Sequence, residues 1–215
     1  MSIKAFLFDL DGTIIDSEKY YRKCWYEALN HFGFKMSFDE AIIMRSFGKP
    51  FVIDYLHKRF GETCDYFEVR KYRDELMKKY IEGDYIGLKD GVIDALEYLK
   101  NKNVVVAMVT ASEIKKTEKF LKKLDIYDYF SNIITTEKVE RGKPAPDVYI
   151  YACKELGLDP TDCVAIEDSP NGVTSAYEAG VRVIMVPDQT EPDIGTSKKL
   201  FKKFDRIDEI KKLPL

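Results

Sequence analysis

Short apolar runs alternate with helical patterns along most of this chain. Residues 3–7 form the first apolar run, and later runs span 103–109, 132–135, 163–166 and 181–186. The stretches that follow or precede the later runs repeat apolar residues at three- and four-residue spacing, which is typical of amphipathic helices. These stretches cover 92–100, 112–124, 146–156 and 170–179. Strands that alternate with such helices predict right-handed βαβ units in a parallel sheet.

Residues 17–83 have a different pattern, because every segment there looks helical. We expect four helices, over 17–32, from Ser37 to the break at Gly48, over 50–60 and over 67–81. Ser37 and Glu40 have the spacing of a capping box, and Pro50 suits the first turn of a helix. The tail, 204–213, predicts a short edge strand and a last helix.

The expected fold class is therefore α/β, with a Rossmann-like parallel sheet flanked by helices on both faces and an inserted all-helical cap domain. The core domain would consist of residues 1–16 and 84–215, and the cap domain of residues 17–83. The length of 215 residues fits one domain with such an insertion.

Composition and charge exclude several classes of protein. A hydrophobic fraction of 45% and a charged fraction of 33% are those of an ordinary soluble globule, and a net charge of -3 argues against a dedicated nucleic-acid binder. Lysine clusters such as 115–116 and 122–123 are interpreted as solvated helix faces. Because we find neither a signal-peptide pattern nor an apolar run long enough to cross a bilayer, we expect a cytoplasmic protein without a membrane partner. We also expect a monomer.

Neither cysteine nor histidine spacing predicts a metal or redox site. The four cysteines have no C-x-x-C pair and are interpreted as reduced packing residues: Cys24, Cys64, Cys153 and Cys163. His31 and His57 fall on expected cap helices, away from the sheet edge, and are interpreted as surface or packing residues.

Two aspartates follow directly on the first apolar run. Alternation along the strand points Asp9 and Asp11 the same way, with Leu10 turned into the core, while Gly12 and Thr13 begin a turn. Open α/β sheets bind their ligands at this carboxyl edge. The two carboxylates form either a solvated acidic turn or a site for a hard divalent cation, most often Mg²⁺.

Polar groups also follow the strand expected at 103–109. Thr110 and Ser112 lie where a helix begins, and helix amino termini bind anions. Ser112 is a suitable helix cap, which would leave Thr110 free to bind phosphate. Lys143 lies in a loop bounded by Pro144 and Pro146, and its expected task is to neutralise phosphate charge.

The strand expected at 163–166 ends in Glu167 and Asp168. One interpretation is an acidic helix start, which the helix dipole favours in any protein. The other is that these acids join Asp9 and Asp11 in an oxygen-ligand shell for magnesium.

Four motifs occur in order at the predicted strand ends: Asp9-Leu-Asp-Gly-Thr, Thr110-Ala-Ser, Lys143-Pro-Ala-Pro-Asp and Glu167-Asp-Ser. In type, order and spacing they resemble the four motifs of the haloacid dehalogenase-like superfamily, chiefly phosphatases and phosphomutases. The resemblance spans essentially the whole chain. The helical insert resembles the cap of the subgroup that contains β-phosphoglucomutase and many sugar-phosphate phosphatases, and Asp16-Ser17-Glu18 resembles the hinge entry of that subgroup.

The resemblance implies a magnesium-dependent phosphatase of small phosphorylated metabolites, above all sugar phosphates. Asp9 would attack phosphorus to form an aspartyl phosphate, and Asp11 would act as general acid and then as general base. Mg²⁺ would be bound by Asp9, Asp168 and the backbone carbonyl of Asp11, with Glu167 reaching it through water. The phosphoryl oxygens would be held by Thr110, the Ala111 amide and Lys143.

Substrate choice is expected to come from the cap, because the four motifs contact only the phosphate. The candidate contacts are Tyr21, Trp25, Arg45, Gly48 and Lys49, for which the alternative is packing inside the cap.

Two other functions stay open at this point. A phosphomutase of the β-phosphoglucomutase kind is weakened because Tyr21 stands where that enzyme has a cap histidine. A non-catalytic, receiver-like magnesium-binding module is weakened by the long cap and by the second acid, Asp11. Haloacid dehalogenation is disfavoured, because Gly12 and Thr13 fit the phosphate-handling version of the first motif.

Overall fold

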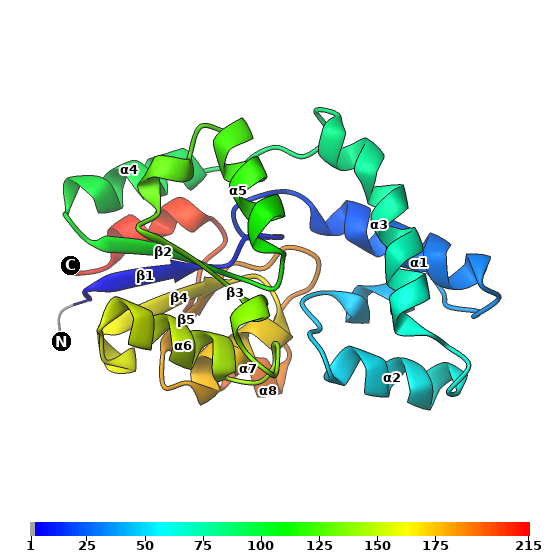
Figure 1. Ribbon diagram of the computed structural model, residues 1–215. Helices are drawn as coiled ribbons and strands as arrows, with labels where there is room; N and C mark the ends of the chain where they lie inside the picture. The colour runs from blue at the N-terminus through cyan, green and yellow to red at the C-terminus, as the bar shows by residue number, and fades with distance from the viewer. Residues whose placement is uncertain (1–2) are drawn as a thin grey trace.

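A six-stranded parallel sheet in the order β3-β2-β1-β4-β5-β6 forms one lobe of the molecule (Figure 1). This computed structural model describes residues 3–215. The strands are β1 Ala5–Phe8, β2 Val105–Thr110, β3 Asn132–Thr135, β4 Cys163–Glu167, β5 Arg182–Met185 and β6 Lys202–Lys203. The central strand β1 pairs with β2 on one side and β4 on the other, so the chain reverses its strand order around β1. Ligands bind at such a switch point in α/β sheets.

Helices cover both faces of the sheet. The longer helices are α1 Glu18–His31, α2 Phe51–Phe60, α3 Tyr66–Glu82, α4 Val92–Asn101, α5 Ile114–Lys123, α6 Asp147–Leu156 and α7 Pro170–Glu178, followed by the short α8 Ile194–Ser197. The 3₁₀ helices are η1 Glu40–Met44, η2 Tyr127–Tyr129, η3 Thr136–Lys138, η4 Pro160–Asp162 and η5 Ile207–Lys212. Phe6 and Phe8 of β1 point toward α4, α5 and η5, whereas Ala5 and Leu7 point toward α6 and α7. The expected fold class is confirmed.

The helices α1, α2 and α3 form a second lobe with an apolar core of its own, to the right of the sheet in Figure 1. Trp25 and Leu29 of α1 pack there with Leu56 of α2 and Val69 of α3. The chain enters and leaves this lobe side by side, because the Asp16 N–H donates to the Gly87 carbonyl at 3.0 Å. An antiparallel bridge between Ile15 and Leu88 adjoins this contact.

Two expected elements differ from the structure. The segment after Ser37 is the 3₁₀ helix η1 and not an α-helix. Only half of the capping box forms, because Ser37 Oγ accepts from the Glu40 N–H at 3.1 Å while the Glu40 carboxylate accepts from Arg59 Nε at 2.6 Å. In the tail, the edge strand lies earlier than expected, at Lys202–Lys203, and the last helix is the 3₁₀ helix η5.

The cysteines and histidines lie where the sequence predicts. All four cysteines are free and buried. His31 is exposed and stacks on Tyr72, with 4.1 Å between ring centroids, and His57 is half-buried on α2. Among residues 3–215, no helix is both long enough and apolar enough to cross a membrane.

Candidate active site

Three buried carboxylates meet where β1 and β4 end. These strands are neighbours, and the Asp9 N–H donates to the Ile166 carbonyl at 3.0 Å. Asp9, Glu167 and Asp168 each offer an oxygen atom, and these atoms all lie within 4.8 Å of one another. The turn after β1 passes close to this cluster, because a Cβ atom on Gly12 would lie 2.5 Å from Asp168 Oδ2. Only glycine fits there, also because its φ is +85°.

Lys143 is fully buried among these acids. Its ammonium donates to Asp9 Oδ1 at 2.6 Å, to Glu167 Oε1 at 2.7 Å and to the Val109 carbonyl at 3.2 Å. The Tyr149 hydroxyl also donates to Glu167 Oε1, at 2.5 Å. Glu167 is therefore the partner of the buried lysine, in addition to lying beside the expected metal ligands. Burial raises the pKa of Asp9, and the Lys143 ammonium opposes this shift.

The cluster has unused oxygen atoms of the kind that a hard cation binds. Within residues 3–215, Asp9 Oδ2, Glu167 Oε2 and both carboxylate oxygens of Asp168 are buried without a hydrogen-bond partner. Burial raises the pKa of Asp168 to about 7, with Glu167 adding to the shift and Arg45 opposing it. Buried carboxylates are normally paired or bound to metal, and oxygen-only ligands suit Mg²⁺. The residues present fit a magnesium ion.

Asp11 is held by two serine hydroxyls. Ser17 Oγ donates to Asp11 Oδ1 at 2.7 Å, and Ser112 Oγ donates to Asp11 Oδ2 at 2.6 Å. The expected capping role of Ser112 is therefore wrong. Glu137 caps α5 instead, because its Oε2 accepts from the Ile114 N–H at 2.8 Å. Ser17 directly precedes α1, the first helix of the helical lobe. The Asp11 carboxylate is therefore hydrogen-bonded to the residue at which the chain passes from the sheet into this lobe.

Thr110 ends β2 beside this carboxylate. Its Oγ1 accepts from the Ser112 N–H at 3.0 Å, so its hydroxyl proton stays available for a ligand. The residue is buried, whereas the adjacent Ala111 is exposed. Both line the cavity between the two lobes.

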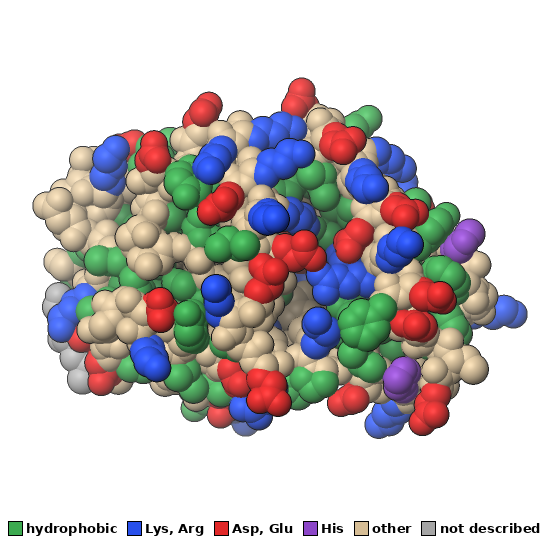
Figure 2. Space-filling view, viewed as in Figure 1, with side chains coloured by type: hydrophobic (Ala, Val, Ile, Leu, Met, Phe, Trp, Pro, Cys, Tyr) green, Lys and Arg blue, Asp and Glu red, His purple; other side chains and the backbone are tan. Residues whose placement is uncertain are grey.

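This cavity measures about 320 Å³. It brings together nine residues that the sequence predicts for the site: Asp9, Asp11, Tyr21, Trp25, Arg45, Gly48, Lys49, Thr110 and Ala111. Lys143, Glu167 and Asp168 lie buried behind Asp9. In Figure 2 acidic and basic side chains gather around the hollow between the lobes. Neither histidine of the chain lines the cavity.

The segment that contains Gly48 docks directly on the loop that carries Lys143. The Gly48 N–H donates to the Lys143 carbonyl, and the Gly142 N–H donates to the Lys49 carbonyl, both at 2.8 Å. The Arg45 guanidinium lies nearby, 3.7 Å from Asp168 Oδ2 and 2.8 Å from the Thr190 hydroxyl. Two backbone hydrogen bonds thus join the helical lobe to the loop of the buried lysine.

Replacing Gly48 by alanine should lower kcat/KM by about 10- to 100-fold, because small displacements of reacting groups are costly. The new Cβ atom would lie 2.7 Å from the Gly142 Cα atom, so the docked loop must shift and move Lys143 with it. The measurement is phosphate release from the best substrate, with Gly195→Ala as control. Gly195 lies on α8, where the nearest atom to an added Cβ is 3.5 Å away. Equal kinetics for both variants would contradict this prediction.

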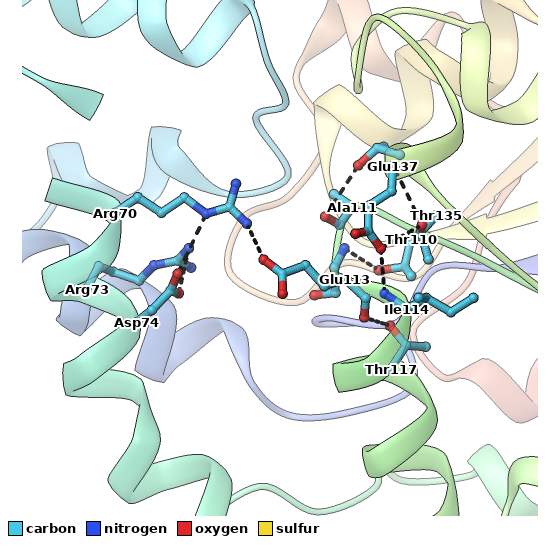
Figure 3. Close-up of polar contacts among 12 residues, drawn as sticks. Arg70, Arg73, Asp74, Thr110, Ala111, Glu113, Ile114, Thr117, Thr135 and Glu137 are labelled. Carbon is cyan, nitrogen blue, oxygen red and sulfur yellow. Dashed lines mark hydrogen bonds and ion pairs between the residues drawn. The ribbon is translucent and has the colours of Figure 1, made fainter. Parts of the chain in front are cut away.

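Several charged residues of the cavity were not predicted from the sequence. Glu18 is buried near Asp11 and Asp168, and burial raises its pKa. Arg70 and Arg73 reach the cavity from α3, as Figure 3 shows. The interpretation of Lys116 as part of a solvated helix face is wrong, because its ammonium lies 4.4 Å from the Tyr21 ring centroid inside the cavity. A sequence signal for these contacts is weak, since they join helices far apart in the chain.

Comparison with known proteins agrees with this arrangement. The chain is 31% identical over 188 residues to hexitol phosphatase A of Escherichia coli, which covers 86% of this chain and 84% of that protein. It is 29% identical over 197 residues to a phosphorylated carbohydrates phosphatase of Thermotoga maritima, with 85% and 84% covered. CbbY of Rhodobacter sphaeroides, crystallised with phosphate, superposes with a TM-score of 0.77 at 26% identity, over 97% of this chain and 96% of that one.

The model of the haloacid dehalogenase-like hydrolase family matches residues 6–186. This range begins in β1 and ends just after β5, so it contains every strand end that contributes to the cavity. The chain therefore belongs to the haloacid dehalogenase-like hydrolases.

Proposed function

We propose that this protein is a magnesium-dependent phosphatase of phosphorylated carbohydrates that works through an aspartyl phosphate on Asp9. The observation that carries the proposal is the buried cluster of Asp9, Glu167, Asp168 and Lys143 beside a cavity between the lobes. Phosphatase activity follows from the family and from the relatives that are named as phosphatases.

Magnesium would be held by Asp9, Asp168 and the backbone carbonyl of Asp11. The unpartnered oxygens of Asp9 and Asp168 support this assignment. Glu167 would contribute through water, as the family resemblance implies. Its Oε1 accepts from Lys143 and Tyr149, and its Oε2 has no hydrogen-bond partner among residues 3–215. When bound, the ion neutralises phosphate charge and orients the ester for in-line attack.

The covalent step requires a carboxylate oxygen of Asp9 to attack phosphorus. The bond from phosphorus to the ester oxygen breaks, and Asp11 donates a proton to that oxygen as it leaves. In the second step a water molecule attacks phosphorus, Asp11 takes its proton, and the Asp9 carboxylate and inorganic phosphate are released. The hydroxyls of Ser17 and Ser112 support this role, because they fix the carboxylate of Asp11 in one orientation.

The transferred phosphoryl group needs donors for its oxygens. Thr110 Oγ, the Ala111 amide and the Lys143 ammonium would supply them. These groups lie at or behind the cavity wall next to Asp9. Preorganised donors of this kind stabilise the charge that develops in the transition state.

Residues 17–83 would act as a cap domain that selects the substrate and excludes water on closure. Tyr21, Trp25, Arg45, Gly48 and Lys49 line the cavity, which supports a role in contacting the leaving group. The paired backbone of Asp16 and Gly87 would serve as the hinge of this cap.

Hydrolysis is favoured over the mutase reaction because Tyr21, and not histidine, occupies the position that the resemblance assigns to the mutase histidine. A non-catalytic magnesium-binding module is disfavoured by the placement of Asp11, whose carboxylate lines the cavity.

A screen of phosphorylated sugars, hexitols, nucleotides and small phosphorylated acids tests the proposal. We expect phosphate release from phosphorylated carbohydrates in the presence of Mg²⁺, and a loss of at least about 100-fold when EDTA removes the metal, since the ion contributes several kcal/mol to transition-state stabilisation. A coupled assay for isomerisation of β-glucose 1-phosphate runs beside it. Isomerisation without phosphate release would overturn the hydrolase assignment, and no reaction with any compound would overturn the proposed function.

A further inference from the structure

The cavity is lined by five cations, Arg45, Lys49, Arg70, Arg73 and Lys116, and by five acids, Asp9, Asp11, Glu18, Asp74 and Glu113. Of these cations, Arg45 lies beside the buried Asp168, at 3.7 Å. The Arg70 guanidinium forms ion pairs with two of these acids, at 3.7 Å from Asp74 Oδ2 and 3.3 Å from Glu113 Oε1 (Figure 3). Arg73 shares Asp74, at 3.0 Å. No carboxylate oxygen of residues 3–215 lies within 4.0 Å of the Lys49 or Lys116 ammonium, and the nearby negative charges that act on Lys116 are those of Asp11 and Glu18.

Arg73 and Tyr21, which both line the cavity, carry polar atoms without a hydrogen-bond partner among residues 3–215. Arg73 is only 9% exposed, and its guanidinium carbon lies 5.0 Å from the Tyr21 ring centroid and 4.6 Å from that of Trp25. In the described part of the chain, neither Arg73 Nε nor the Tyr21 hydroxyl has a hydrogen-bond partner, although both atoms are buried. Buried donors in native proteins are nearly always paired, so both atoms lack an acceptor that a ligand could supply.

Lys116 approaches the same aromatic ring from the other lobe. It lies on α5, one helical turn after Ser112, and its ammonium is 4.4 Å from the Tyr21 ring centroid. Burial lowers the pKa of Lys116, while the negative charge of Asp11 and Glu18 opposes this shift. The Tyr21 ring is thus in contact with one cation from the helical lobe and one from the sheet lobe.

We infer that the leaving group of the substrate carries a second anionic group, a phosphate or a carboxylate, which binds Arg73, Lys116 and the Tyr21 hydroxyl. The inference rests on the proposed function and specifies which phosphorylated carbohydrates the site accepts. Arg73 shares Asp74 with Arg70, and Lys116 has no ion pair among residues 3–215, so a leaving group with hydroxyls alone would add no counterion for either cation. An anion accepts hydrogen bonds from all three donors, and such charge-assisted bonds are the strong ones.

These cations do not serve the phosphoryl group that is transferred. That group must contact Asp9, where Lys143 already supplies positive charge at 2.6 Å. Figure 3 shows Arg70 and Arg73 on α3, across the opening from Thr110 and Ala111. In an in-line displacement the leaving group lies opposite the nucleophile, so it extends toward α3.

Three open-chain hexitol derivatives test the inference, because they differ only at carbon 1. Glucitol 6-phosphate has a hydroxyl there, 6-phosphogluconate a carboxylate, and glucitol 1,6-bisphosphate a phosphate. We expect kcat/KM for at least one anionic compound to exceed that of glucitol 6-phosphate by about tenfold or more, which equals one charge-assisted hydrogen bond. The preferred compound distinguishes carboxylate from phosphate.

Arg73→Met and Lys116→Met should each lower this ratio of kcat/KM values about tenfold, mainly through KM for the anionic compound. Lys119→Met is the matched control, because Lys119 lies exposed on the same helix, and it should leave the ratio unchanged. Thermal denaturation shows whether the variants fold. If Arg73→Met does not fold, Lys116→Met alone tests the inference. A wild-type ratio of one or less, or an unchanged ratio in the folded variants, overturns the inference alone. Failure of every compound in the broader screen overturns the proposed function instead.

Discussion

Asp9→Asn should lower kcat by about 10⁴-fold or more, the order of loss that follows removal of a nucleophile. The neutral amide oxygen is a poor nucleophile toward phosphorus, and no other carboxylate can take its place, since Asp11 is held by two hydroxyls and Asp168 lies behind the turn. The variant should stay folded, because asparagine has nearly the same shape as aspartate. It also replaces a carboxyl group whose pKa is raised by burial, so the folded protein no longer has to bury that negative charge. Phosphate release and thermal denaturation measure the two outcomes.

Asp162→Asn is a suitable control for this substitution. Asp162 lies at the amino end of β4, away from the cavity, and pairs with Lys4 at 2.7 Å. We expect its kcat to stay within about twofold of the wild-type value, because surface ion pairs contribute little. Similar activity in both variants would refute the assignment of Asp9 as nucleophile.

Lys143→Met should lower the free energy of unfolding by about 3–5 kcal/mol, the usual effect of removing one partner of a buried ion pair. Its ammonium is the shared donor to Asp9 and Glu167, and all three side chains are almost fully buried. Without it, two carboxylates would face each other without a cation. Urea denaturation in the presence of EDTA measures the effect on the protein alone, and phosphate release should be lost as well.

A second substitution separates charge from packing in this prediction. Adding Glu167→Gln to Lys143→Met removes one of the unpaired charges, so it should restore part of the lost stability. Lys154→Met, an exposed lysine of α6, should change the unfolding free energy by no more than about 0.5 kcal/mol. Equal stability of Lys143→Met and Lys154→Met would mean that the buried lysine does not stabilise the acidic cluster.

The sheet was predictable because its strands are covered on both faces. Such strands consist of nearly continuous apolar residues, so the runs at 3–7 and 163–166 lie within two residues of β1 and β4. Parallel strands end at the same edge of a sheet. The convergence of Asp9 and Asp168 could therefore be expected although more than half of the chain separates them.

The contacts between the two lobes could not be predicted in the same way. Arg73 and Lys116 lie on helices whose charged positions have the spacing of a solvated face, and nothing local shows that the Tyr21 ring lies between them. The docking of Gly48 on Gly142 depends on backbone atoms, which leave no pattern in the residue types beyond two glycines. The role of Ser112 was predicted wrongly because a serine hydroxyl can either accept from a backbone N–H at a helix start or donate to a carboxylate. Here it donates to Asp11, and Glu137 accepts from the first N–H of α5.

The paired backbone at Asp16 and Gly87 also bears on how such enzymes diversify. An insert whose two ends meet at one point can be exchanged for another without moving the strands to which it is joined. Ancestral changes in residues 17–83 could then alter which metabolites are recognised while the chemistry at the sheet edge stayed the same. A chimaera that carries this segment from a relative with another preference should inherit that preference.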